Sequence, residues 1–142
     1  MVGMDLWGTK LVVLSACETG LGDVKNGEGV YGLRRALVLA GSETQVMSLW
    51  KVSDAGTRDL MVAYYTRLQR GESRTEAMRQ VQLAMLRGDL LPGSGNKQLN
   101  LRDTVDTDEL ARAKDYRHPY YWAAFIASGD WRNLDGSEAH SR

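Results

Sequence analysis

Residues 11–22 read LVVLSACETGLG, and this stretch decides the fold of the chain. It starts with a short apolar run rich in β-branched side chains, which predicts a strand inside a sheet that is covered on both faces. Four glycines and several charges then fall within residues 20–29, and they predict a mobile surface loop. The single cysteine, Cys17, stands between the two, one residue past the predicted strand.

The next segments alternate between helical and strand patterns. Residues 30–41 (VYGLRRALVLAG) carry apolar side chains near helical spacing and end at a glycine, which is a common helix stop. Residues 45–52 (QVMSLWKV) predict a second strand. A helix over residues 55–70 is expected to follow, with Ser53 or Asp54 as its N-cap.

Beyond residue 70 the chain predicts one more helix, an excursion and a third strand. Residues 73–76 (SRTE) match a capping box, and the helix that they open is expected to end at Gly88. Residues 89–117 are polar and rich in turn-forming residues, which indicates a surface excursion. Residues 122–128 predict the third strand, with a short helix as the alternative.

This order of elements predicts an α/β fold. Strands that alternate with helices form a mostly parallel sheet with helices on both faces. We expect one domain over residues 1–133 and a disordered tail over residues 134–142. Three strands make a narrow sheet, so the chain is expected to be part of a larger domain. Ligands in such sheets bind beyond the carboxyl ends of the strands, which is where this prediction puts Cys17.

Composition excludes several classes of function. Eighteen basic residues balance eighteen acidic ones, which removes the electrostatic reason to expect DNA or RNA as a ligand. No apolar run approaches the roughly 20 residues that cross a membrane, and the start of the chain lacks the features of a signal peptide. One cysteine cannot form an internal disulfide, which fits a reducing, cytoplasmic location. One cysteine and two histidines also argue against a structural zinc site, and no cofactor is predicted.

Cys17 has two interpretations from the residues alone. A free cysteine is among the most buried residue types, so a small core side chain is the stronger interpretation on this ground. The alternative is a nucleophile, which needs a nearby histidine, a basic group or a helix N-terminus to become a thiolate. In that case the backbone N–H of Cys17 would be one donor of an oxyanion hole, and glycines such as Gly20 would let a substrate chain approach closely.

Three separate segments resemble one known family. They are residues 11–41 (LVVLSACETGLGDVKNGEGVYGLRRALVLAG), 46–54 (VMSLWKVSD) and 118–132 (HPYYWAAFIASGDWR), and in this order they closely resemble the CHAT domain, named for its association with TPR repeats. The resemblance implies a caspase-like three-layer α/β sandwich (clan CD), related to caspases and separase, of which this chain would be a part. It also implies a cysteine endopeptidase, whose nucleophile in the S-A-C-E-T motif falls on Cys17.

The family pattern places its histidine before the cysteine, and this chain departs from that pattern. Sixteen residues precede Cys17, and none of them is histidine. In caspases the interval is about 50 residues. We therefore expect the C-terminal part of a CHAT domain, with the histidine supplied by a missing N-terminal part and little activity from this chain alone. Neither His118 nor His140 is expected to replace that histidine.

The resemblance also assigns substrate-binding residues. Caspase-like enzymes present the strand after the nucleophile to a peptide substrate, so Ser48, Leu49 and Trp50 would line the cleft, with Trp50 as the wall of a side-chain pocket. A core tryptophan is the alternative for Trp50. Asp54 is similar to the final acid of the W-D-V-T-D run of separase, which would select a basic P1 residue, although an N-cap also explains an aspartate there. The aromatic residues at 120–122 are expected in the core.

Two other functions remain open at this point. One is a non-catalytic scaffold, in the manner of a degenerate protease homologue. The other is a truncated domain whose exposed sheet edge leads to a homo-oligomer. The resemblance implies a protein or peptide as substrate, and TPR repeats or other sensor domains as partners.

Overall fold

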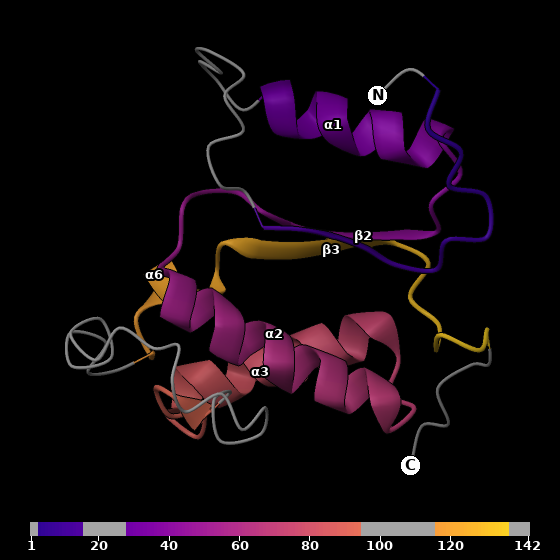
Figure 1. The fold of residues 1–142 in the computed structure, drawn as a ribbon. Helices are drawn as coiled ribbons and strands as arrows, with labels where there is room; N and C mark the ends of the chain where they lie inside the picture. Colours follow the sequence, from indigo (N-terminus) through magenta and orange to yellow (C-terminus); the bar gives the residue numbers. More distant parts are fainter. Residues whose placement is uncertain (1–2, 16–27, 95–115, 137–142) are drawn as a thin grey trace.

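The computed structural model describes residues 3–15, 28–94 and 116–136. The elements are, in chain order, β1 (Val12–Leu14), α1 (Glu28–Leu39), β2 (Thr44–Ser48), α2 (Asp54–Gln69), α3 (Arg74–Arg87), α6 (Pro119–Trp122) and β3 (Phe125–Gly129). They form three layers: α1 lies on one face of a three-stranded sheet, and α2 and α3 lie on the other face (Figure 1). The predicted α/β class, with helices on both faces of the sheet, is confirmed.

The sheet has the order β1–β2–β3, with β2 in the centre. β1 pairs with β2 in parallel, with Leu14 opposite Met47, and β2 pairs with β3 antiparallel, with Ser48 opposite Phe125. The connection between β1 and β2 contains α1, as expected for a parallel pair, because parallel strands need a long crossover. The third strand adds an antiparallel edge to this parallel pair, which is a common arrangement in α/β folds.

The bounds of the second and third strands differ from the prediction. The second strand ends at Ser48 instead of Val52, and the third runs over Phe125–Gly129 instead of 122–128. Residues 119–122 form the helical turn α6, so the strand and the short helix predicted as alternatives are both present, one after the other. The physical reason is that strand ends are set by pairing, and β2 ends where its antiparallel partner begins.

Burial differs between the strands. All five residues of β2 are buried, whereas the residues of β1 are half-buried, although the sequence predicted a strand covered on both faces. β2 has a strand on each side, but β1 is an edge strand among the described residues. The apolar run therefore located the strand correctly and overestimated its burial.

The main core lies between the sheet and the α2–α3 pair. Val46 of β2 belongs to it, whereas the buried neighbour Met47 does not, because successive side chains of a strand point to opposite faces. The other buried members come from α2, α3, the segment before α6, and the start of β3. They include Leu60, Tyr64, Leu68, Ala77, Met78, Val81, Met85, Tyr116, Ala124 and Phe125.

Serine side chains begin both helices of this layer. The Ser53 hydroxyl accepts the backbone N–H of Gly56 at 3.0 Å, so Ser53 is the N-cap of α2 and Asp54 is its first helical residue. Ser73 caps α3 in the same way, by accepting the backbone N–H of Glu76 at 3.3 Å. The Glu76 carboxylate accepts from side chains of its own helix, so only one half of the predicted capping box is formed.

A buried arginine joins three distant parts of the chain. Arg74, at the start of α3, is fully buried, and its guanidinium donates to the Thr44 hydroxyl at 2.6 Å and to the Asn133 carbonyl at 3.2 Å. It also donates to the Glu43 carboxylate at 3.2 Å, which supplies the opposite charge that a buried cation needs. The starts of β2 and α3 and the segment after β3 are therefore held together.

Candidate functional site

The described elements bring several chain segments to one edge of the sheet. β1 and β2 are parallel, so their carboxyl ends lie at the same edge, and the antiparallel β3 begins there. α2 starts and α6 lies at this edge too, on the left in Figure 1. We call residues 14–15, 48–54 and 118–125 the carboxyl edge. This is the position at which ligands bind in open α/β sheets.

The candidate nucleophile lies beyond the described part of the chain. Cys17 and Gly20 fall within residues 16–27, outside the described residues, so their roles stay predictions. The structure does show where the chain leaves β1: Leu14 lies opposite Met47, and Ser15 follows as an exposed residue. The strand end that precedes the cysteine in sequence is therefore at the carboxyl edge.

The three predicted cleft residues differ in exposure. Ser48 is the last residue of β2 and is buried opposite Phe125. Leu49 and Trp50 follow it and are 43% and 40% exposed. Trp50 is therefore no core tryptophan, and it is Leu49 and Trp50 that present side chains to solvent.

The Trp50 indole is fixed by a hydrogen bond to α6. Its Nε1–H donates to the carbonyl oxygen of Tyr120 at 3.1 Å. Tyr120 is itself exposed, which corrects the expectation that residues 120–122 all lie in the core. Two exposed aromatic residues, from segments far apart in the sequence, thus meet at the carboxyl edge.

His118 lies at the same edge, where its side chain accepts a hydrogen bond from the backbone. It is the N-cap of α6, and its Nδ1 accepts the backbone N–H of Tyr120 at 3.2 Å. Its side chain is exposed. A capping role thus accounts for this histidine without any part in catalysis.

Asp54 stands in the first turn of α2 with an exposed side chain. Since Ser53 is the N-cap, capping does not account for the aspartate. A negative charge in the first turn of a helix does stabilise it through the helix dipole. Within the described residues no cation pairs with Asp54.

A buried hydrogen-bonded cluster supports the carboxyl edge from the interior. Asp59, on α2, is buried and accepts the hydroxyl of Tyr116 at 2.6 Å and the backbone N–H of Gly93 at 2.7 Å. The rings of Tyr116 and Tyr121 have centroids 5.2 Å apart, and Tyr121 meets Tyr120 edge-on at the same separation. Aromatic contacts therefore connect the polar interior of α2 to α6, which holds the indole.

Sequence reasoning missed this cluster, although two signals point to it. Asp59 immediately precedes Leu60, which belongs to the apolar stripe of the predicted helix, and an acid beside a buried position needs donors nearby. Gly56 is the second signal. A Cβ at this glycine would lie 3.0 Å from Cδ1 of Tyr121, so α6 approaches α2 so closely here that any larger residue would have to displace the tyrosine ring.

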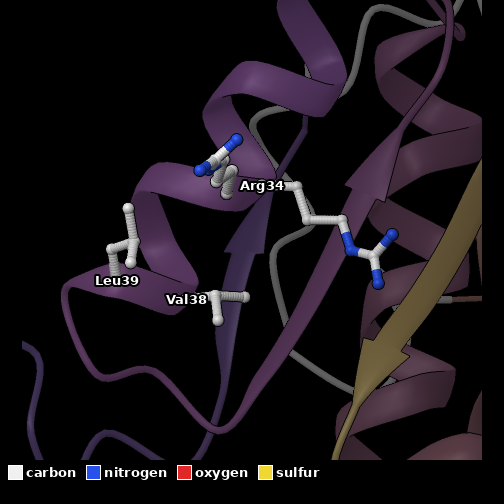
Figure 2. A pocket seen from close by; sticks show the side chains of 4 residues that line it. Arg34, Val38 and Leu39 are labelled. Atoms are coloured by element: carbon white, nitrogen blue, oxygen red, sulfur yellow. The ribbon is translucent and has the colours of Figure 1, made fainter.

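The described part of the chain shows neither a metal cluster nor a membrane-spanning helix. Among its residues, no three His, Cys, Asp or Glu side chains are grouped to hold a metal ion. None of its helices is long and apolar enough to cross a bilayer. One surface hollow lies away from the carboxyl edge, on α1, where Arg34, Arg35, Val38 and Leu39 line it (Figure 2).

Comparison with known proteins identifies one family. The model of the CHAT domain family matches residues 1–130, which is most of the chain and includes the whole carboxyl edge. No curated protein and no solved structure matches the chain.

Proposed function

Because the chain belongs to the CHAT domain family, a caspase-like family related to proteases, we propose that it forms part of a cysteine endopeptidase domain with Cys17 as the nucleophile. The observation that supports this is the parallel pairing of β1 with β2, which ends both strands at the edge where Leu49 and Trp50 are exposed. Cys17 follows Leu14 by three residues, so chain connectivity keeps their Cα atoms within about 11 Å of each other. This limit is compatible with the proposed role of Cys17 at the carboxyl edge.

The proposed reaction would take its base from outside the given residues. The two histidines of the sequence are His118, which caps α6, and His140, near its end. A histidine from outside these residues would take the proton of the Cys17 thiol, and the thiolate would attack the carbonyl carbon of the peptide. Backbone N–H groups, that of Cys17 among them, would hold the oxyanion. The C–N bond would break as the imidazolium returns the proton to the leaving amine, and water would hydrolyse the thioester.

An extended substrate would bind beyond the end of β2. Both sides of β2 are occupied, by β1 and by β3, so a peptide cannot pair with residues 44–48. The N–H of Leu49 is also used, by the carbonyl of Ala124 at 2.8 Å. Trp50 and Lys51 are exposed and make no backbone hydrogen bond to another described residue, so the substrate would pair with their N–H and C=O groups.

Asp54 would select a basic P1 side chain. Its exposed carboxylate follows Trp50 by four residues and has no cation partner in the described structure. An arginine of the substrate would place its charge near this carboxylate and its stem against the indole of Trp50. The pocket would therefore combine an aromatic wall with a negative end.

Covalent labelling tests the nucleophile and the pocket together. The protein, extended to include the family's histidine, is treated with an acyloxymethyl ketone that carries arginine at P1. We expect labelling that Cys17→Ala abolishes. Asp54→Asn is expected to lower the preference for arginine over alanine at P1 about tenfold, which corresponds to about 1.4 kcal/mol.

Iodoacetamide is the control reagent, because it reports whether the thiol is accessible without any peptide recognition. Ketone labelling that persists in Cys17→Ala would reject the nucleophile. An accessible Cys17 that iodoacetamide modifies and the ketone does not would favour the scaffold function instead.

The partners and the location are proposals that rest on the family and the sequence alone. We propose that TPR repeats or other sensor domains regulate the domain, in the cytoplasm. The outer side of β1 carries no strand among the described residues, so the remaining strands of a complete sheet would pair there. A homo-oligomer through this sheet edge would compete with them.

A further inference from the structure

Exposed apolar side chains gather on the layer formed by α1. Val38 and Leu39, in its last turn, are 51% and 74% exposed, and Met4 and Trp7, in the N-terminal segment, are 53% and 84% exposed. The two pairs are neighbours, since the hollow of Figure 2 and a second hollow, lined by Met4 and Trp7, share Leu39. We call these four side chains the α1 patch. It lies on the side of the sheet opposite to α2 and α3 (Figure 1).

The α1 patch is held in place by backbone contacts. The N–H of Leu6 donates to the carbonyl of Ala40 at 2.8 Å, which fixes the N-terminal segment against the end of α1. Trp7 packs against Gly41, where an added Cβ would lie 3.0 Å from Cγ of the indole. Because the backbone beneath this exposed apolar surface is already fixed, little conformational entropy is lost when a partner binds, which favours a role in binding.

Charges of opposite sign stand at the two ends of the α1 patch. Arg34 and Arg35, one turn before its helical residues, line the hollow of Figure 2. Asp5 lines the second hollow beside Trp7, whose backbone N–H it accepts at 3.0 Å. Among the described residues, neither the two arginines nor Asp5 forms an ion pair.

We propose that the α1 patch is the interface of a dimer of this chain. A two-fold axis near Leu39 would place the apolar side chains of one copy against the same side chains of the other. The same axis would bring Asp5 of each copy to Arg34 and Arg35 of its partner. A surface that is negative at one end and positive at the other is complementary to itself in this arrangement.

The charge pattern selects a second copy over other occupants. An acidic peptide would pair with Arg34 and Arg35 but would also meet the like charge of Asp5. A basic peptide would face the opposite conflict. The interface is also distinct from the open side of β1, and it does not depend on the proposed peptidase activity.

Sedimentation velocity of the full chain over a range of concentrations tests the interface. We expect reversible dimerisation that Leu39→Glu abolishes, because the charge would fall at the centre of the apolar contact. Leu91→Glu is the matched control, since Leu91 is 65% exposed and lies after α3, outside the α1 patch. Circular dichroism checks that each variant is folded. If Leu39→Glu does not fold, Val38→Lys tests the same interface. A chain that stays monomeric, or a dimer that survives these changes, would overturn the proposal.

Charge reversal tests the two-fold arrangement itself. Asp5→Arg alone is expected to weaken dimerisation about tenfold, and so is Arg34→Glu combined with Arg35→Glu, because each brings like charges together. All three changes together are expected to restore the affinity to within about threefold of the original. If the triple variant is as weak as the others, the two ends do not meet across the axis and the arrangement is wrong.

Discussion

The Asp59 carboxylate connects the interior of the molecule to its candidate site. It accepts from Tyr116, whose ring leads through Tyr121 to α6, and α6 holds the Trp50 indole. A buried polar group that loses a partner cannot recover the bond from water. A continuous series of contacts therefore runs from a hydrogen bond in the core to the exposed indole.

Replacing Tyr116 with phenylalanine removes one donor to Asp59 and keeps the ring. We expect Tyr116→Phe to lower the free energy of unfolding by about 1–3 kcal/mol, measured by urea denaturation. Tyr65→Phe is the control, because Tyr65 is exposed and loses a hydroxyl that water can serve. Equal urea midpoints for the two variants would show that the bond to Asp59 adds nothing to stability.

The partners of the buried charged residues could not be predicted from the sequence. Asp59 accepts hydrogen bonds from residues 93 and 116, and Arg74 donates to residues 43, 44 and 133, none of which is a neighbour in the sequence. Charged side chains are rarely buried, so a pattern of polar and apolar residues assigns them to the surface. The exposed residues of the site were easier to predict, because Trp50 and Asp54 belong to one short segment of the sequence.

At the level of elements, the helices followed their sequence signals more closely than the strands. α2 and α3 begin directly after Ser53 and Ser73, because a cap and the first turn it serves are adjacent in sequence. The ends of β2 and β3 depend on their pairing, which joins segments that a local pattern cannot relate. The same reason explains why the half-burial of β1 was missed.

Substitutions at the start of α2 distinguish a structural role of Asp54 from a substrate-binding role. We expect Ser53→Ala to lower the free energy of unfolding by about 1 kcal/mol, because the backbone N–H of Gly56 loses its acceptor. Asp54→Asn is expected to cost only about 0.3–0.5 kcal/mol, since it removes an exposed charge from the first turn. Chemical denaturation of both variants measures the difference. A larger loss for Asp54→Asn than for Ser53→Ala would mean that the aspartate is mainly structural.

Across the whole molecule, ionisable groups limit the pH range of stability. A hydrogen bond from Lys10 lowers the pKa of the Glu43 carboxyl below its ordinary value of 4.5. Hydrogen bonds from Arg132 lower the pKa of Asp130 below its ordinary value of 3.8. Burial raises the pKa of Tyr64 above its ordinary value of 10.0.

These shifts predict a stability plateau with two limits. The contributions of Glu43 and Asp130 are complete above the ordinary pKa values of 4.5 and 3.8 and are lost as the pH falls through the lowered ones. The contribution of Tyr64 is complete below 10.0 and is lost as the pH rises toward its raised pKa. Thermal unfolding from pH 2 to 11 should therefore show the Tm falling at both ends.

Two variants test which residues cause the acid and alkaline declines in the Tm. Tyr64→Phe is expected to reduce the alkaline decline, and Asp130→Asn the acid decline. The Tyr64 hydroxyl has no hydrogen-bond partner in the described structure, so its loss is also expected to leave stability at neutral pH undiminished. An unchanged alkaline limb in Tyr64→Phe would place its origin in another group.

The buried Arg74 has a practical consequence for where the chain is cut in the laboratory. The family match ends at residue 130, short of Asn133, whose carbonyl accepts from the guanidinium. A chain that ends at residue 130 would keep the buried Arg74 guanidinium but lose one of its hydrogen-bond acceptors. A poor yield of that shortened chain would then say nothing about the stability of the complete fold. Domain limits for expression are better drawn from the reach of enclosed side chains than from the extent of sequence similarity.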